Sequence, residues 1–190
     1  MQQQQQPSCA ASEASPVALV QSSAADLDIA VTSLHKGNLE ALKLMNSIIF
    51  PLKYSDQVYR DCMQFPQLTA LAYHQDTLVG AIMGRLEVRK AKEGGGGSSS
   101  SPGGARLYIA SLGVLAPYRG YKVGSQLLTR SLAGAAEDSM VMEAVVHMHV
   151  GNDDGKRFYE RHGFKVTETV PNYYRSLDPP DALVLVHPLR

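Results

Sequence analysis

The sequence predicts an α/β fold in which helices pack on a mixed β-sheet. Stretches with helical and strand periodicity alternate along the chain, and 44% of its 190 residues are hydrophobic against 19% charged. This composition is sufficient to bury a domain-sized core. Neither a Gly-x-Gly-x-x-Gly nor a Walker pattern occurs, which argues against a doubly wound nucleotide-binding fold.

Low-complexity segments set the limits of this domain. Residues 1–27 hold a glutamine run followed by Ala, Ser and Pro, and such a composition cannot offset its ordering entropy by burial, so we expect a disordered tail. The tail has no Lys or Arg, unlike an organellar presequence. The Gly/Ser-rich stretch at 91–104 predicts a flexible loop insertion between two strands. One domain would therefore span residues 28–190.

Two helices and two strands are predicted in the first half of the domain. Apolar residues recur at helical spacing over 39–49, with Asn38 as the N-cap, and Ser55 begins a short second helix. Residues 68–74 and 77–88 have the composition of strands, and the two residues between them form a tight hairpin.

The second half continues the alternation. The predicted elements are a strand at 105–115, a helix from about Gly124, a strand at 141–150, a helix over 156–163 and strands at 164–170 and 182–187. Pro117 closes the first of these strands, and Gly163 stands where a helix is expected to end in a left-handed residue.

Charge and cysteine content exclude several classes of function. Eighteen Lys and Arg balance eighteen Asp and Glu, so a general electrostatic attraction to nucleic acid or to an anionic membrane is not expected. No apolar run approaches the ~18 residues of a membrane helix. Cys9 and Cys62 cannot form a disulfide framework. His147 and His149 share one face of a strand, but no convincing set of Cys, Asp or Glu completes a zinc site, so no metal is expected.

The turn at 115–124 joins a predicted strand to a predicted helix and is a candidate anion site. Free backbone N–H groups and the helix dipole both favour an anion at a helix N-terminus. An ordinary strand-to-helix connection is the alternative.

This turn carries a family resemblance. Residues 119–124 resemble the Arg/Gln-x-x-Gly-x-Gly/Ala pyrophosphate loop of the GNAT acetyltransferases, and Asn152, Phe158-Tyr159 and Gly163-Phe164 resemble their second coenzyme A element. Five further segments are similar, in order over residues 34–187, to the NatE-type N-α-acetyltransferases of that family. The resemblance implies a GNAT fold, with a central mixed, mostly antiparallel twisted sheet flanked by helices.

The resemblance also implies a catalytic pair, Tyr108 and His147. Together they would deprotonate the acceptor amine through an ordered water, with Tyr108 also a proton donor to sulfur. Backbone amides of Leu112, Gly113 and Val114 would hold the acetyl carbonyl. Without the resemblance, Tyr108 reads as a core tyrosine with a satisfied hydroxyl.

Acetyl-CoA is the implied acetyl donor. The implied binding residues are Arg119, Gly120, Tyr121, Lys122, Val123, Gly124, Ser125, Asn152, Phe158 and Tyr159. Lys122 departs from the family, which usually has glycine there. Its backbone N–H stays available if its φ is negative, and its ammonium would attract phosphate in a salt-dependent way.

The implied acceptor site lies around the turn after the first helix. Phe50, Pro51, Leu52 and Tyr54 would form an apolar pocket for the first side chain of the acceptor, and Tyr173 and Tyr174 would bond its backbone. Arg85 and Ala110 align near the acceptor, although the family often has methionine where Ala110 stands. The alternatives are hydrophobic core for Phe50 and Leu52, and a packed loop pair for the two tyrosines.

The function implied is N-α-acetylation of nascent protein N-termini, those that retain methionine. A lysine ε-acetyltransferase and a non-catalytic GNAT subunit are the alternatives. The implied partners are the NatA catalytic and auxiliary subunits at the ribosome, without direct nucleic acid or membrane contact, in the cytoplasm and also the nucleus.

Overall fold

The computed structural model describes residues 27–88 and 104–190. The predicted tail at 1–27 and the predicted loop at 91–104 fall outside these ranges, apart from Leu27 and Gly104 at their ends. Among the described residues, no helix is long and apolar enough to span a membrane.

Seven strands form one sheet in the order β1-β2-β3-β4-β5-β7-β6. The strands are β1 (Ile29–Ser33), β2 (Ala70–His74), β3 (Thr77–Val88), β4 (Ala105–Val114), β5 (Val141–His149), β6 (Lys165–Val170) and β7 (Ala182–Pro188). Every neighbouring pair is antiparallel except β4 and β5, which are parallel. The predicted mixed, mostly antiparallel GNAT sheet is thus confirmed, while β1 was not predicted.

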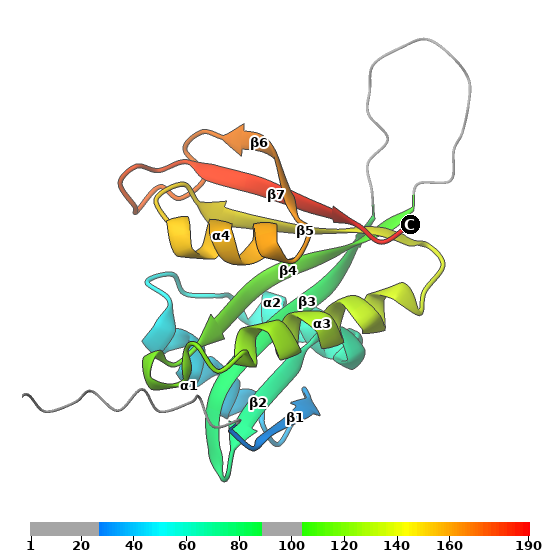
Figure 1. Cartoon of the computed structure of the whole chain (residues 1–190), viewed down its shortest axis with the longest axis vertical. Helices are drawn as coiled ribbons and strands as arrows, with labels where there is room; N and C mark the ends of the chain where they lie inside the picture. The colour runs from blue at the N-terminus through cyan, green and yellow to red at the C-terminus, as the bar shows by residue number, and fades with distance from the viewer. Residues whose placement is uncertain (1–26, 89–103) are drawn as a thin grey trace, which may run out of the picture.

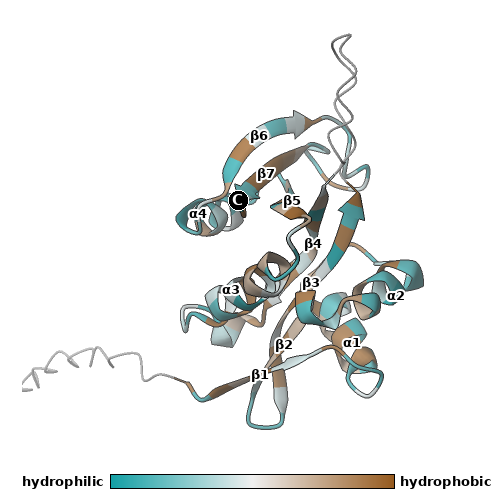
Figure 2. Cartoon of the chain, turned by 90° about the vertical axis from the view of Figure 1, so that its right-hand side faces the viewer, coloured by the Kyte–Doolittle hydropathy of each residue, from teal (hydrophilic) through white to brown (hydrophobic). Residues whose placement is uncertain are grey.

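Helices cover both faces of this sheet. They are α1 (Leu39–Ile49), α2 (Asp56–Gln64), α3 (Val123–Ala136) and α4 (Asp153–Arg161), with 3₁₀ turns at Pro66–Leu68 and Ala116–Tyr118. In Figure 2, α3 and α4 lie on one side of the sheet and α1 and α2 on the other. Figure 1 shows the chain from the side of α3 and α4.

Each face of the sheet has its own apolar core, formed with the helices that pack on it. On the α1 and α2 face, Leu42 and Cys62 are buried against strand residues such as Met83. On the α3 and α4 face, Leu127 and Leu128 pack with Ile82, Leu107 and Phe164, among others. Burying a large apolar side chain contributes about 1.5–3 kcal/mol, so these two layers fix the helices on the sheet.

The two parallel strands separate at one end. Their pairing stops at Ile109 and Val146, although β4 continues to Val114 and β5 to His149. Figure 1 shows the ends of β4 and β5 diverging between α3 and α4. Within the described parts of the chain, the facing edge of β4 beyond Ile109 therefore has no strand partner for its backbone groups.

A β-bulge at Ala110 changes the direction of the side chains along β4. Ile109 pairs with Gly84 and Ser111 pairs with Met83, so Ala110 is an extra residue opposite this pair. Ala110 packs with the α1 and α2 core, and Leu112, two residues on, packs with the α3 and α4 core instead. A strand without this bulge would place both on one face.

Asn38 and Ser55 occupy the N-cap positions of α1 and α2, but their side chains make no capping hydrogen bond. Asn38 Oδ1 instead accepts from the backbone N–H of His35, and its amide donates to the Ser33 carbonyl. The side chain of Asn38 therefore ties β1 to α1 and is not free to cap the helix. The predicted left-handed residue at Gly163 is confirmed, with φ +82°.

Candidate active site

Two cavities adjoin the separated ends of β4 and β5. The first, of about 500 Å³, is called the tyrosine cavity and is lined by Leu52, Lys53, Tyr54, Val58, Arg85, Tyr108, Ala110, His147, Tyr173, Tyr174, Arg175 and Ser176. The second, of about 690 Å³, is called the loop cavity and is lined by Leu112, Val114, Tyr118, Arg119, Gly120, Lys122, Val123, Gly124, Ser125, Asn152, Asp154, Gly155, Phe158, Tyr159, Arg161 and His162. Because the bulge changes the face to which the following side chains of β4 point, Tyr108 and Ala110 line the tyrosine cavity, whereas Leu112 and Val114 line the loop cavity.

Tyr108 and His147 meet in the tyrosine cavity, as the resemblance implied. Tyr108 comes from β4 and His147 from β5, and their ring centroids lie 5.5 Å apart. The Tyr108 hydroxyl is 3.0 Å from the Tyr173 hydroxyl. His147 stacks on the Tyr173 ring, with centroids 4.7 Å apart and planes 13° from parallel. The three rings form one contiguous group.

Burial sets the protonation of this group. It raises the pKa of the Tyr108 phenol well above its usual range, and the hydrogen bond with Tyr173 raises it further, so the phenol is neutral. Burial, together with the charge of Arg106, lowers the pKa of His147 below 6.5, so its imidazole is neutral at physiological pH. Among the described residues, nothing hydrogen-bonds the buried His147 Nδ1. The site thus combines an available base with a protonated phenol.

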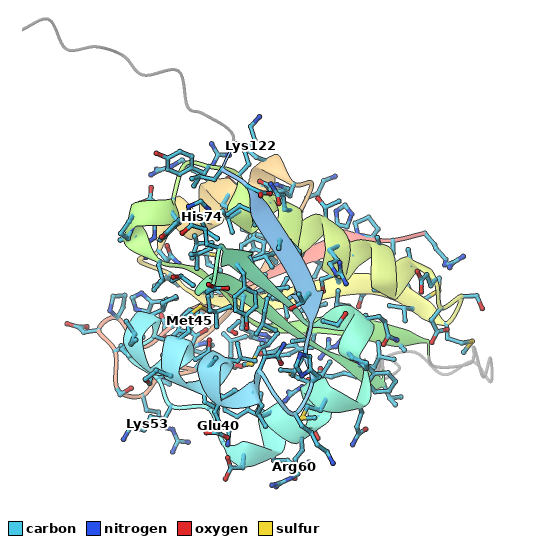
Figure 3. The ribbon with its side chains drawn as sticks, turned by 90° about the horizontal axis from the view of Figure 1, so that it is seen from below. Glu40, Met45, Lys53, Arg60, His74 and Lys122 are labelled. Carbon is cyan, nitrogen blue, oxygen red and sulfur yellow. The ribbon has the colours of Figure 1, made fainter. Side chains whose placement is uncertain are left out.

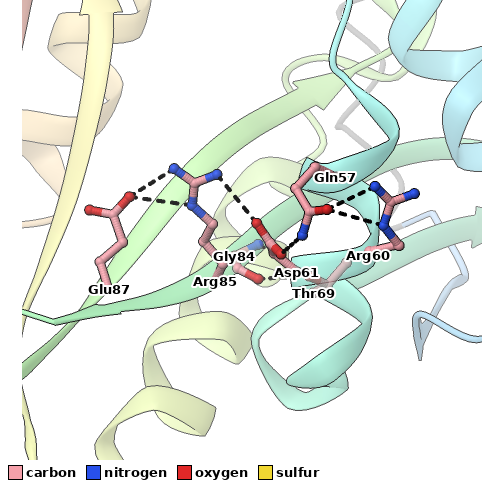
Figure 4. A network of polar contacts seen from close by, with 7 residues as sticks. All are labelled: Gln57, Arg60, Asp61, Thr69, Gly84, Arg85 and Glu87. Carbon is pink, nitrogen blue, oxygen red and sulfur yellow. Dashed lines mark hydrogen bonds and ion pairs between the residues drawn. The ribbon is translucent and has the colours of Figure 1, made fainter.

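Arg85 lies against the face of Tyr108. Its guanidinium carbon is 4.8 Å from the ring centroid, a cation–π arrangement. Figure 4 shows the polar network that holds it: Arg85 donates to Glu87 at 2.8 Å and lies 4.0 Å from Asp61. Glu87 also accepts from Arg106. Burial favours a higher pKa for the Glu87 carboxyl, but the two arginines outweigh it and lower the pKa.

The segment between β6 and β7 forms one wall of the tyrosine cavity. Its Tyr174 donates from the hydroxyl to the His147 carbonyl at 3.1 Å and from the backbone to the Pro180 carbonyl at 2.7 Å. Burial raises the pKa of Tyr174 to about 12. His149 Nε2 contacts the Pro179 carbonyl at 2.6 Å, and its Nδ1 accepts from the Gly151 N–H. The side chain of His149 thus bonds the segment that carries Tyr173 and Tyr174.

Most residues predicted for the acceptor site line this cavity. They are Leu52, Tyr54, Arg85, Ala110, Tyr173 and Tyr174. Phe50 and Pro51 do not: Pro51 is exposed, and the half-buried Phe50 ring packs edge-on against Tyr54, with centroids 5.9 Å apart. Phe50 therefore supports the wall from behind. Sequence reasoning missed four lining residues, Lys53, Val58, Arg175 and Ser176, although Lys53 and Arg175 directly follow the predicted site residues Leu52 and Tyr174.

The loop cavity collects the residues of the predicted coenzyme A site with two exceptions. Tyr121 is partly exposed and does not line it. Gly113 points to the opposite face, where an added Cβ would lie 3.0 Å from the Phe50 ring. That orientation follows from the bulge, which the sequence pattern did not reveal.

The backbone of the loop corrects the expectation for Lys122. Its φ is +60°, and that of Gly120 is +87°, so Lys122 adopts the left-handed conformation that glycine favours. Lys122 is the N-cap of α3, and its carbonyl accepts the first helical bond, from Gln126. The N–H groups of Val123, Gly124 and Ser125 have no acceptor within the helix. Figure 3 shows the Lys122 side chain extending outward.

Helix α4 closes the loop cavity from the other side. Asn152 Oδ1 accepts from Gly155 N–H and caps the helix. His162 has two partners: Nδ1 lies 2.8 Å from the Phe158 carbonyl and Nε2 lies 3.0 Å from Ser125 Oγ. Since a carbonyl only accepts, Nδ1 carries a proton and donates to it. This pair joins the first turn of α3 to the end of α4.

The donor set of the loop cavity fits acetyl-CoA. Free N–H groups at a helix N-terminus suit a diphosphate, and Arg119, Lys122 and Arg161 add positive charge. The unpaired edge of β4 can bond an extended amide chain. No group of three or more His, Cys, Asp or Glu placed to hold a metal ion occurs within residues 27–88 and 104–190.

Known proteins resemble this chain in sequence and in fold. The acetyltransferase (GNAT) family matches residues 39–164. N-alpha-acetyltransferase 50 from Danio rerio is 35% identical over 153 residues, covering 80% of this chain and 84% of the relative. The "Probable N-acetyltransferase san" of Drosophila melanogaster is 31% identical over 153 residues, covering 80% and 77%.

A solved structure agrees with these relatives. Arabidopsis thaliana Naa50 in complex with the bisubstrate analogue CoA-Ac-MVNAL superposes with a TM-score of 0.73 at 37% identity, covering 83% of this chain and 97% of that one. The sequence match, the strand order of the sheet and the two cavities thus all indicate an acetyltransferase of this family. This chain belongs to the acetyltransferase (GNAT) family and is, within that family, an acetyl-CoA-dependent N-α-acetyltransferase.

Proposed function

We propose that this enzyme acetylates protein N-termini that retain methionine, inside the tyrosine cavity. The main support for the proposal is that Tyr108 and His147 both line this cavity, at the point where β4 and β5 separate. Leu52, Val58 and Ala110 supply an apolar wall suited to a flexible thioether side chain. The analogue bound by Arabidopsis Naa50 has peptide letters, MVNAL, that begin with methionine.

Acid–base chemistry follows from the protonation of the pair. Acetyl-CoA supplies the acetyl group as a thioester, so a C–N bond forms as a C–S bond breaks. An α-ammonium, with a pKa near 7.7–8.0, needs only a modest base, and the neutral His147 with Tyr108 removes its protons through an ordered water. Of the two protons lost on forming the amide, one leaves to solvent. The other protonates sulfur, with Tyr108 as the donor.

The loop cavity would hold acetyl-CoA. The N–H groups of Val123, Gly124 and Ser125 would bond the diphosphate, as free helix N-termini do. Backbone groups over 112–114, on the unpaired edge of β4, would bond the acetyl carbonyl and the extended amide chain. Asn152, Phe158 and Tyr159 would form the wall facing that chain.

A lysine ε-amine is the second candidate acceptor, and its basicity disfavours it. Its pKa near 10.4 demands a stronger base than His147, whose pKa is lowered by burial. A purely non-catalytic subunit is disfavoured because Tyr108 and His147 are both present and adjacent.

The proposed partners are the NatA catalytic and auxiliary subunits at the ribosome, and the proposed location is the cytoplasm and also the nucleus. Both proposals rest on the likeness to NatE-type enzymes. Nucleic acid and membrane are not proposed as direct partners, because the net charge of the chain is zero.

Acetyl-CoA turnover on two sets of short peptides tests the acceptor. One set has free N-termini beginning with Met or with Ala, and the other has blocked N-termini and one internal lysine. We expect turnover of the free Met peptides, and less of the Ala peptides. Activity confined to the blocked lysine peptides would overturn the proposal.

A further inference from the structure

Two cations that lack a partner among the described residues lie at the mouth of the tyrosine cavity. Lys53 belongs to the turn between α1 and α2, and Arg175 directly follows Tyr174 in the segment between β6 and β7. Both side chains are exposed, and neither makes an ion pair or hydrogen bond with the described residues. Figure 3 shows Lys53 directed outward from the turn after α1. We call these two residues the cationic rim.

The carboxylates around the cavity are already engaged. Asp61 accepts from Gln57 and lies near Arg85, while Glu87 binds Arg85 and Arg106. Two carboxylates on the neighbouring segments are also engaged: Asp56 pairs with Lys43, and Asp181 accepts from the backbone of Asn172. Asp178, exposed three residues after Arg175, pairs with neither rim cation. The charge of Arg85 is thus compensated, whereas the cationic rim has no ion pair with the described residues.

The rim lies where an acceptor peptide must pass. The α-amine has to reach Tyr108 and His147, which also line the cavity, so the chain behind it extends outward at about 3.4 Å per residue. A few residues after the first, its side chains come level with the mouth. Long lysine and arginine stems can follow such a chain over several positions.

We propose that the cationic rim selects acceptors with an acidic side chain about two to four residues after the first residue. This inference rests on the proposed function, whose α-amine acceptor it narrows to N-termini with a nearby carboxylate. Complementary charge at a rim acts mainly on encounter and on KM. It also disfavours peptides with lysine or arginine at those positions.

The expected preference is moderate. Exposed ion pairs are weak and screened by salt, so two rim cations favour a glutamate peptide over its glutamine isostere by about three- to tenfold in kcat/KM at low ionic strength. At about 0.5 M salt the ratio should fall toward one.

The proposal is tested by changing the charge of the acceptor peptide and the charge of the rim residues in the enzyme. Met-Leu-Gly peptides with a free N-terminus carry one Glu, Gln or Lys at the third, fourth or fifth position, and kcat/KM is measured with the full-length enzyme. The variants are the doubles Lys53→Gln/Arg175→Gln and Lys53→Glu/Arg175→Glu. The matched control is Lys36→Glu/Lys165→Glu, which makes the same charge change at exposed positions outside both cavities. Thermal melting checks that each variant is folded.

Three outcomes are distinguishable. The proposal holds if the parent and the control prefer Glu, the Gln double loses the preference, and the Glu double reverses it toward Lys. Equal rates for Glu and Gln peptides, or the same loss in the control, would overturn the rim while the turnover of neutral peptides keeps the proposed function intact. If no peptide with a free N-terminus is acetylated, both proposals fail.

Discussion

The phenol oxygens of Tyr108 and Tyr173 lie 3.0 Å apart, which joins strand β4 to the segment between β6 and β7. Tyr173 also stacks on His147, so one side chain touches both members of the proposed catalytic pair. Because the Tyr108 phenol is neutral, one of the two hydroxyls donates to the other. The wall of the tyrosine cavity therefore orients the Tyr108 phenol.

The first prediction concerns the catalytic pair. Tyr108→Phe and His147→Ala should each lower kcat by about 10²–10⁴-fold, the usual contribution of a general acid or base. KM for acetyl-CoA should stay near the parent value, since neither side chain lines the loop cavity. Steady-state kinetics measures both, with Tyr73→Phe on β2 as a matched tyrosine control. A folded variant with parent-like kcat would reassign that residue to structure.

The second prediction concerns pH. The pKa of His147 is lowered in the folded state, chiefly by burial, so below pH 6.5 the unfolded chain binds the proton more readily. The stability associated with His147 is therefore retained above pH 6.5 and declines as pH falls from there toward the folded-state pKa. Melting temperatures between pH 7.5 and pH 5 should drop less for His147→Gln than for the parent. Equal slopes in the two proteins would contradict the lowered pKa.

Local patterns were sufficient for much of this molecule. Helical spacing located α1 and α3, whose apolar stripes are buried, and composition located β3 and β4. The family resemblance added the pairing of Tyr108 with His147, whose separation of 39 positions has no local signal. That pairing follows from the adjacency of β4 and β5, which sequence periodicity does not give.

Other features depend on tertiary structure. Simple alternation places Ala110 and Leu112 on one face, and only the bulge against β3 sends them to different cavities. The positive φ of Lys122 is imposed by the loop around it. A lysine rarely adopts this conformation, so the residue type itself did not predict it. The His162–Ser125 contact joins two helices across 37 positions and has no local signal in the sequence.

The third prediction concerns Phe50, which supports Tyr54 from behind. Phe50→Ala should raise the peptide KM more for Met-starting than for Ala-starting peptides, because Tyr54 would lose the ring that holds it in the cavity wall. The lost apolar contact corresponds to about 1–3 kcal/mol. Phe50→Leu is the matched control and should retain most of the selectivity. Equal losses on both peptides would indicate general misfolding.

The fourth prediction concerns the left-handed Lys122. Lys122→Gly removes a conformational cost of about 1–2 kcal/mol and adds back part of it through the flexibility of glycine. The melting temperature should rise by about 2–4 °C. Lys122→Ala keeps the unfavourable φ and should give no such rise. The acetyl-CoA affinity of Lys122→Gly, measured by titration at low and high salt, should depend less on salt than that of the parent. Parallel salt slopes would mean that the ammonium faces solvent without effect.

The last prediction concerns His149, which contacts the Pro179 carbonyl at 2.6 Å and accepts from Gly151 N–H. Since its Nδ1 accepts, Nε2 must donate, and this bond holds the segment that carries Tyr173 and Tyr174. His149→Ala should raise the peptide KM by about two- to tenfold, as expected for one lost hydrogen bond, with KM for acetyl-CoA unchanged. Glutamine can donate and accept in the same places, so His149→Gln should restore much of the peptide KM. A parent-like KM in the alanine variant, or an equal defect in both variants, would show that His149 does not position this wall.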